Sequence, residues 1–130
     1  MNKILFYPAI FHKEPEGGYW ISFPDIPECF SQGKDMEEAY SMATEALGLA
    51  LTDGENLLDN LPIPSKIEDI KVDDGIIVLV SFNYLEYVKK YCNKAVKKTL
   101  SIPKWLNEAA IREGINFSQV LQEALIQRLI

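Results

Sequence analysis

The chain has 130 residues and a formal net charge of −6, with 48% hydrophobic and 25% charged residues. This length fits one ordinary domain or two very small ones, and the composition is typical of a globular protein rather than a disordered one. No apolar run reaches the roughly 18–20 residues that cross a bilayer, and no cleavable leader is expected. The two cysteines, Cys29 and Cys92, are too few for a disulfide scaffold. We therefore expect a cytoplasmic protein with reduced thiols and without a cofactor.

The net charge is unevenly distributed along the chain. Residues 1–80 contain five lysines and fifteen acidic residues, a net charge of −10, whereas residues 81–130 carry +4. Six lysines and no acidic residue fall between positions 88 and 104. Such asymmetry indicates either separate partners for the two parts or, equally well, a lysine-rich face that is simply solvated. The overall acidity, taken alone, argues against binding to nucleic acid.

The first part of the chain contains three segments with the composition of β-strands. Apolar, β-branched and aromatic residues predict strands at 3–12, 19–23 and 28–32, with a turn at 16–18 that makes the first two a hairpin. Pro8 cannot donate a hydrogen bond to a neighbouring strand. We therefore expect it at a bulge or facing an unpaired side of the sheet.

A helix and a fourth strand follow. Asp35 is a suitable N-cap with Glu38 in the capping-box position, and the predicted helix ends at Gly54. The uninterrupted apolar run 75–82 is typical of a strand that is buried on both faces and lies inside the sheet. Residues 83–92 are amphipathic and predict a short connecting helix. The first part is thus an α+β domain of order β-β-β-α-β.

The last part predicts one strand and two short helices. In the β segment 95–102, apolar side chains alternate with polar ones that can form hydrogen bonds. Pro103 suits the first turn of a helix that stops at Gly114. Asn116 can cap a second helix, which extends to Ile130. These 36 residues are too few to bury a sufficient core alone.

Pairing of two copies would complete this small domain. The two strands would form an antiparallel ribbon, and four helices would cover one side of it. Such a ribbon fits the major groove of DNA, and the N–H groups at the start of the second helix can hold a phosphate. The predicted DNA-binding residues are Lys97, Thr99, Ser101, Asn116, Phe117 and Ser118.

Both parts resemble known families. The stretch from Lys97 to Leu129 resembles a ribbon-helix-helix DNA-binding domain, through the polar alternation into Ile102-Pro103, a helix, Gly114 and a capped helix ending in Glu-Ala-Leu. The N-terminal part resembles the HicB antitoxin family. The matching residues are Tyr7-Pro-Ala9, Gly18-Tyr19, Phe23-Pro-Asp-Ile-Pro27, Cys29, Gly33 and Glu37-Glu-Ala39, with Ala43 and Glu45-Ala46-Leu47. Glu28 stands where the family commonly has glycine, so the turn after Pro27 is expected to differ.

The resemblance implies a type II toxin–antitoxin antitoxin. Residues 1–82 would form a partial ribonuclease-H-like domain that neutralises a HicA-like toxin, a small mRNA-cleaving ribonuclease with a catalytic histidine. Residues 83–94 would connect it to a homodimeric domain, 95–130, that binds operator DNA and represses the operon. The acidic first part suits a basic, RNA-cleaving partner. The residues expected to contact the toxin are Glu14, Glu16, Tyr19, Asp25 and Glu28.

Two other functions are compatible with the sequence. The N-terminal part could be an active metal-dependent nuclease or a small-molecule sensor, although no acidic residue is evident inside the first or fourth strand. Alternatively, the chain is a ribbon-helix-helix repressor without a toxin. His12, the single histidine, is expected in solvent at a strand end, and both cysteines are expected to be buried and inert. We therefore predict no catalytic residue and no metal site.

Overall fold

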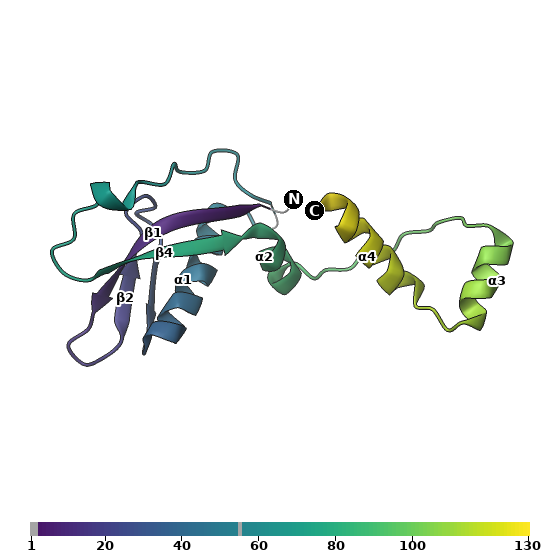
Figure 1. Ribbon diagram of the computed structural model, residues 1–130, viewed down its shortest axis with the longest axis horizontal. Helices are drawn as coiled ribbons and strands as arrows, with labels where there is room; N and C mark the ends of the chain where they lie inside the picture. The colour runs from purple at the N-terminus through teal and green to yellow at the C-terminus, as the bar shows by residue number, and fades with distance from the viewer. Residues whose placement is uncertain (1–2, 55) are drawn as a thin grey trace. The chain divides into compact units, whose positions relative to one another are not determined.

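The computed structural model describes residues 3–54 and 56–130 and divides the chain into two units, residues 3–93 and 94–130, which are considered separately (Figure 1). The described part of the first unit contains four strands, two α-helices and a short 3-10 helix. These are β1 (Ile4–Lys13), β2 (Tyr19–Ser22), β3 (Phe30–Gly33), α1 (Met36–Leu51), the 3-10 helix (Ile67–Asp69), β4 (Ile76–Asn83) and α2 (Tyr84–Tyr91). Within the described residues, no helix combines the length and apolar character needed to cross a membrane.

The strands form one antiparallel sheet in the order β3-β2-β1-β4. The prediction that the apolar run 75–82 lies inside the sheet is therefore wrong, because β4 is an edge strand. Helix α1 packs against one face of the sheet (Figure 1), which buries Val80 and Phe82 but leaves Leu79, on the other face, 45% exposed. An apolar run indicates burial on both faces only when both faces are covered.

The core lies between α1 and one face of the sheet. Alternate residues of β1 and β4 point toward the helix and are buried together with its alanine-rich stripe. Gly33 in β3 allows the close approach of α1, because a Cβ atom there would overlap the backbone of Ala39. The buried core residues of these elements are Tyr7, Ala9, Phe11, Ile21, Ala39, Ala43, Leu47, Leu51, Val80 and Phe82.

Helix α1 begins as predicted and ends earlier than predicted. Asp35 Oδ1 accepts a hydrogen bond from Glu38 N at 2.8 Å, and Glu38 Oε1 accepts one from Lys34 N at 3.1 Å. The helix ends at Leu51 rather than near Gly54, because Thr52 already has an extended backbone. The hydroxyl of Thr52 donates to the carbonyl of Gly48 at 2.8 Å.

Pro8 lies in the middle of β1, opposite Leu79. The N–H of Ser81, two residues further along β4, donates to the Tyr40 hydroxyl at 3.2 Å and therefore points away from β1. Backbone N–H and C=O groups two residues apart in a strand point the same way, so those of Leu79 also point away from β1. The backbone groups of its partner Pro8 therefore point away from β4. Pairing with β2 begins only at Ile10, so the Pro8 nitrogen faces the side beyond the end of β2, as predicted.

The segment between α1 and β4 is held to the rest of the unit by side-chain hydrogen bonds. Tyr7 Oη donates to the carbonyl of Pro62 at 2.6 Å. The Asp25 carboxylate accepts hydrogen bonds from both the backbone N–H and the hydroxyl of Ser65. Leu57 and Leu61 pack against the core. This long connection is thus anchored at both ends of the Pro62–Ser65 stretch.

The second unit consists of helices α3 (Lys104–Arg112) and α4 (Phe117–Leu129), preceded by a segment without regular secondary structure. Gly114, with φ of +69°, terminates α3, and Ile115 N donates to the carbonyl of Ala110 at 3.0 Å. Asn116 Oδ1 accepts from Gln119 N at 3.1 Å and caps α4. Both helix boundaries follow the predicted signals.

Candidate nucleic-acid and protein-binding surfaces

The predicted reading residues Lys97, Thr99 and Ser101 lie in an exposed segment of the second unit that has no regular secondary structure. Residues 95–102 form no strand in the single chain, which differs from the predicted β segment. A strand requires a hydrogen-bonded neighbour, and the described residues of one copy do not supply one. If the segment pairs as a strand, side-chain alternation places these polar residues on the face opposite to Leu100 and Ile102.

The other predicted DNA-binding residues lie at the start of α4. Asn116 uses its side chain as the helix cap, whereas Phe117 and Ser118 occupy the first two helical positions. N–H groups in the first turn have no acceptor within a helix, and the helix dipole makes this end attractive to an anion. The site therefore offers backbone donors, and the Asn116 side chain orders them.

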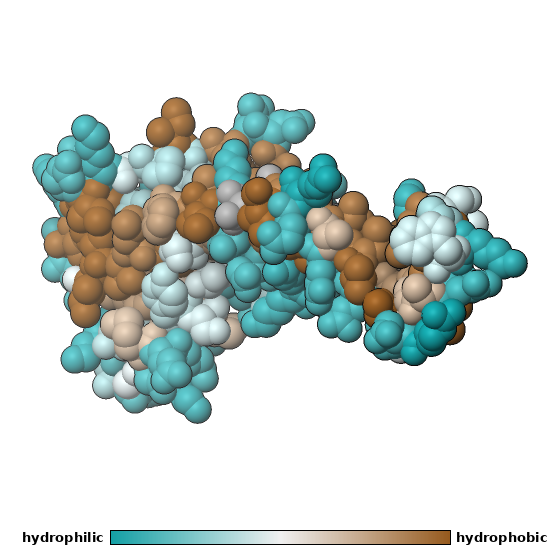
Figure 2. All heavy atoms as spheres, turned by 45° about the vertical axis from the view of Figure 1, so that its right-hand side comes forward, coloured by the Kyte–Doolittle hydropathy of each residue, from teal (hydrophilic) through white to brown (hydrophobic). Residues whose placement is uncertain are grey.

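The apolar side chains of the second unit are not enclosed. None of residues 94–130, all of which the structure describes, is buried. Hydrophobic residues of the segment before α3 and of both helices are exposed, and Figure 2 shows brown hydrophobic atoms at the surface of the helical part. The exposed members are Val96, Leu100, Ile102, Trp105, Leu106, Ile111, Ile115, Phe117, Val120, Leu125, Leu129 and Ile130. An apolar surface of this extent is typical of an interface that another chain covers.

The five residues expected to contact a toxin do not form one cluster. Glu14 and Glu16 lie in the turn that joins β1 to β2, whereas Asp25 and Glu28 lie in the connection at the other end of β2. Tyr19 packs against the core, with its ring 6.1 Å from that of Phe11.

Asp25 has a structural role, because it binds Ser65. The sequence did not reveal this contact, which joins residues forty positions apart.

The face of the sheet opposite α1 is a surface that the sequence prediction missed. Its exposed residues include Phe6, Trp20, Phe30 and Leu79. The alternation of residues between the two faces of each strand could be read from the sequence. However, an apolar residue on the uncovered face has the same appearance in a sequence as one in the core.

His12 lies on this uncovered face and is half-buried rather than solvated as predicted. Its ring stacks on Trp20, with centroids 3.7 Å apart, and its Nε2 lies 3.0 Å from Ser22 Oγ. The imidazole thus fixes the orientation of the indole. Its contacts are to Trp20 and to the hydroxyl of Ser22, both on the neighbouring strand β2.

The two cysteines differ in their surroundings. Cys29 is buried, and burial together with the nearby charge of Glu28 raises the pKa of its thiol to about 11. Cys92 is only half-buried, contrary to the prediction, and its Sγ donates to the carbonyl of Gly54 at 3.1 Å.

Burial, and to a smaller extent the charge of Asp25, raise the pKa of the Tyr7 hydroxyl, which keeps this hydroxyl protonated as a hydrogen-bond donor.

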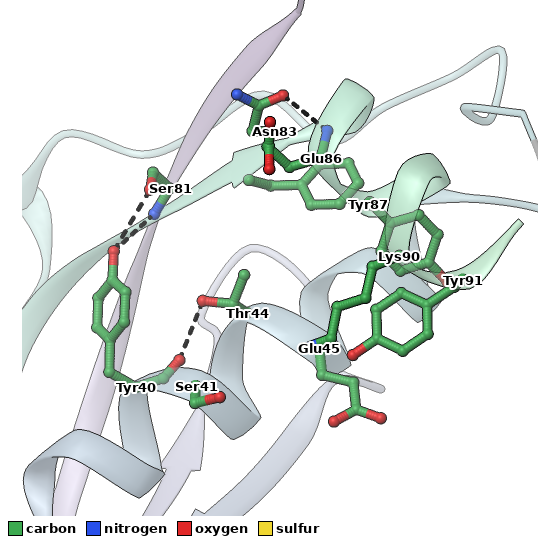
Figure 3. Close-up of a pocket in the computed structure, with 11 residues that line it drawn as sticks. Tyr40, Ser41, Thr44, Glu45, Ser81, Asn83, Glu86, Tyr87, Lys90 and Tyr91 are labelled. Atoms are coloured by element: carbon green, nitrogen blue, oxygen red, sulfur yellow. Dashed lines mark hydrogen bonds between the residues drawn. The ribbon is translucent and has the colours of Figure 1, made fainter. Parts of the chain in front are cut away.

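A hollow of about 290 Å³ lies between α1, the end of β4 and α2 (Figure 3). The Tyr40 hydroxyl points across it to Ser81, and the Thr44 hydroxyl donates to the carbonyl of Tyr40 at 3.0 Å. Lys90 and Tyr91 come from α2, with the ammonium 5.2 Å from the ring centroid. Several of the polar groups that line the hollow are therefore already engaged within the protein. Nowhere in the described part of the chain do three His, Cys, Asp or Glu side chains gather as metal ligands.

Exposed apolar surfaces of this kind are typical of proteins that associate with other chains. The family model for HicB-like antitoxins of bacterial toxin–antitoxin systems matches residues 7–124, and the chain belongs to this family. "Antitoxin HicB 1" of Photorhabdus laumondii is 39% identical over 71 residues, which make up 55% of this chain and 46% of that protein. The chain thus matches about half the length of this relative.

Solved structures show the same fold. A chain in a toxin–antitoxin complex from Streptococcus pneumoniae is 28% identical, with a TM-score of 0.58 and coverage of 97% of this chain and 99% of that one. The antitoxin HicB of Burkholderia pseudomallei, at 23% identity, has a TM-score of 0.53 and coverage of 96% of both chains. The predicted family and the predicted α+β class are confirmed.

Proposed function

We propose that this chain is an antitoxin that neutralises a small, basic, HicA-like mRNA-cleaving toxin and represses its own operon as a DNA-binding homodimer. Residues 3–93 bind the toxin, and residues 94–130 form one half of a ribbon-helix-helix domain. Membership of the antitoxin family supports the first role, as does the likeness to a chain from a toxin–antitoxin complex. The geometry of the second unit supports the second role.

The observation that carries the DNA-binding proposal is the absence of any buried residue in 94–130. A folded unit with well-formed helices needs an apolar core, and a second copy supplies the missing half. Pairing of two 95–102 segments places Leu100 and Ile102 against the helices. The same pairing presents Lys97, Thr99 and Ser101 twice on the opposite face of the ribbon, where they reach base edges in the major groove.

Charge supports this division of roles. Residues 94–130 contain six basic and three acidic residues, a net charge of +3, which dimerisation doubles. Residues 3–93 contain seven lysines and sixteen acidic residues, a net charge of −9. The positive dimeric unit is attracted to DNA phosphates, and the negative unit to a protein that binds RNA.

The test of DNA binding uses the full chain and its upstream promoter. The variant Lys97→Ala/Thr99→Ala/Ser101→Ala should lose at least about 100-fold of its discrimination between promoter and scrambled DNA, because each good base contact is worth about 1–3 kcal/mol. The matched control is Lys98→Ala, which removes the same charge from the neighbouring position on the other face. It should weaken binding to both DNAs alike. An unchanged discrimination ratio in the triple variant would refute the assignment of the reading face.

The test of toxin binding begins with the neighbouring gene. We expect a short reading frame that encodes a basic, histidine-containing protein. The purified product should cleave mRNA, and the full chain added in equimolar amount should suppress the cleavage. If no such frame is present, or if the product cleaves at the same rate with and without the chain, the toxin-neutralising role is refuted and a repressor without a toxin is left.

A further inference from the structure

The uncovered face of the sheet has an unusual composition for a surface. The strand positions on this face, opposite to α1, carry no Asp, Glu, Lys or Arg side chain. These residues are Ile4, Phe6, Pro8, Ile10, His12, Trp20, Ser22, Phe30, Gln32, Ile77, Leu79, Ser81 and Asn83. Surface strands normally alternate apolar inward with polar outward residues. Depletion of charge together with enrichment of aromatic residues is the composition of an interface core.

Several of these side chains are open to solvent. The exposed fractions are 50% for Phe6, 41% for Trp20, 64% for Phe30 and 45% for Leu79, whereas Pro8 between them is fully buried. Figure 2 shows hydrophobic residues gathered over a broad area of this unit. Trp20 is also held in place, because it stacks on His12, which contacts Ser22. A rigid aromatic residue loses little conformational entropy when a partner covers it.

The charges around this face identify the kind of partner. Glu14 and Glu16 follow β1, and Asp73 and Asp74 precede β4; since the two strands are antiparallel, these four acidic residues lie at the same end of the sheet. The whole unit, residues 3–93, carries −9. Two copies packed through this face would bring like charges together, whereas a basic protein gains attraction at the rim and apolar burial at the centre.

We propose that the uncovered face of the sheet, centred on Phe6, Trp20, Phe30 and Leu79, is the docking surface for the basic toxin. The inference rests on the proposed antitoxin function and assigns a surface to it. The aromatic and aliphatic centre supplies affinity, and the acidic end of the sheet accelerates encounter. Increasing salt should therefore slow association while leaving dissociation nearly unchanged.

The experiment compares exposed apolar residues on and off this face in the full chain. The test variant is Phe30→Ser/Leu79→Ser. The matched control is Leu49→Ser/Ile63→Ser, which changes two residues that are 67% and 88% exposed but lie in α1 and in the following loop. Calorimetric titration with the purified product of the adjacent reading frame gives the affinity. Circular dichroism and promoter binding verify that each variant is folded.

The test variant should bind this protein at least tenfold more weakly, because it truncates two exposed apolar residues of the docking face, and loss of hot-spot contacts has effects of this size or larger. The control variant should bind the toxin as tightly as the wild type, and both variants should bind the promoter DNA with unchanged affinity. If the wild-type chain does not bind the protein at all, the proposed function itself fails. If the wild type binds and the test variant binds equally tightly, only the docking surface is refuted. The test variant could instead form a smaller oligomer than the wild type and still bind the toxin. This result would assign the face to contact with a second copy of the chain.

Discussion

Gly48 in α1 offers a sharp test of how the helices of the first unit pack. The residue is buried, and a Cβ atom at this position would overlap the ring of Tyr87 and lie 3.1 Å from Phe82 Cε2. Replacement of a helix-interior glycine by alanine normally gains about 1 kcal/mol of stability. Here the ring cannot move aside easily, because it packs edge-on against Phe82 with centroids 5.4 Å apart and lies 5.0 Å from the ring of Tyr91.

The two effects oppose each other, and the steric one should win. Overpacking of a core costs about 1–3 kcal/mol, so Gly48→Ala should lower the free energy of unfolding by up to about 2 kcal/mol after the gain in helix propensity. Urea unfolding followed by tryptophan fluorescence measures this change. In a Tyr87→Ala background the overlap is absent, and the same substitution should be neutral or stabilising by about 1 kcal/mol. If Gly48→Ala is more stable than the wild type, the proposed contact between α1 and α2 is wrong.

Three further outcomes are expected. Tyr40→Phe removes the acceptor of the Ser81 N–H at the open edge of β4 and should lower the free energy of unfolding by about 0.5–1.5 kcal/mol in the same urea assay; an unchanged value would mean that water replaces the hydroxyl at no cost. At pH 8 iodoacetamide should label Cys92 well before Cys29, because burial raises the pKa of Cys29 to about 11 and suppresses its thiolate; equal rates would contradict this burial. The melting temperature of the 94–130 unit should rise with protein concentration, since in the proposed homodimer a second chain completes its core; a concentration-independent value from micromolar to millimolar would rule this out.

Local signals in the sequence were reliable for the helices. The cap of α1 at Asp35, the cap of α4 at Asn116 and the stop at Gly114 involve residues within five positions of one another. Such contacts form in the same way whatever surrounds them. The charge division between the two parts is likewise a property of the sequence alone. The α+β class follows from these elements and their order.

Only the tertiary structure decided which faces are covered. The edge position of β4 depends on the strand order, and the exposure of Phe30 and Leu79 depends on the single helical layer over the sheet. The contact of Asp25 with Ser65 joins residues forty positions apart, so no local pattern indicates it. Likewise, the stacking of His12 on Trp20 depends on strand register.

The sequence by itself therefore determined the helices, their caps and the separation of an acidic part from a basic one, because these depend on neighbours along the chain. The tertiary structure decided which apolar residues form the core and which remain at the surface. An apolar side chain has the same chemistry in both places, and only the presence or absence of a second layer distinguishes them. Residues 95–102 form no strand in this structure, since a strand exists only when its N–H and C=O groups have a partner.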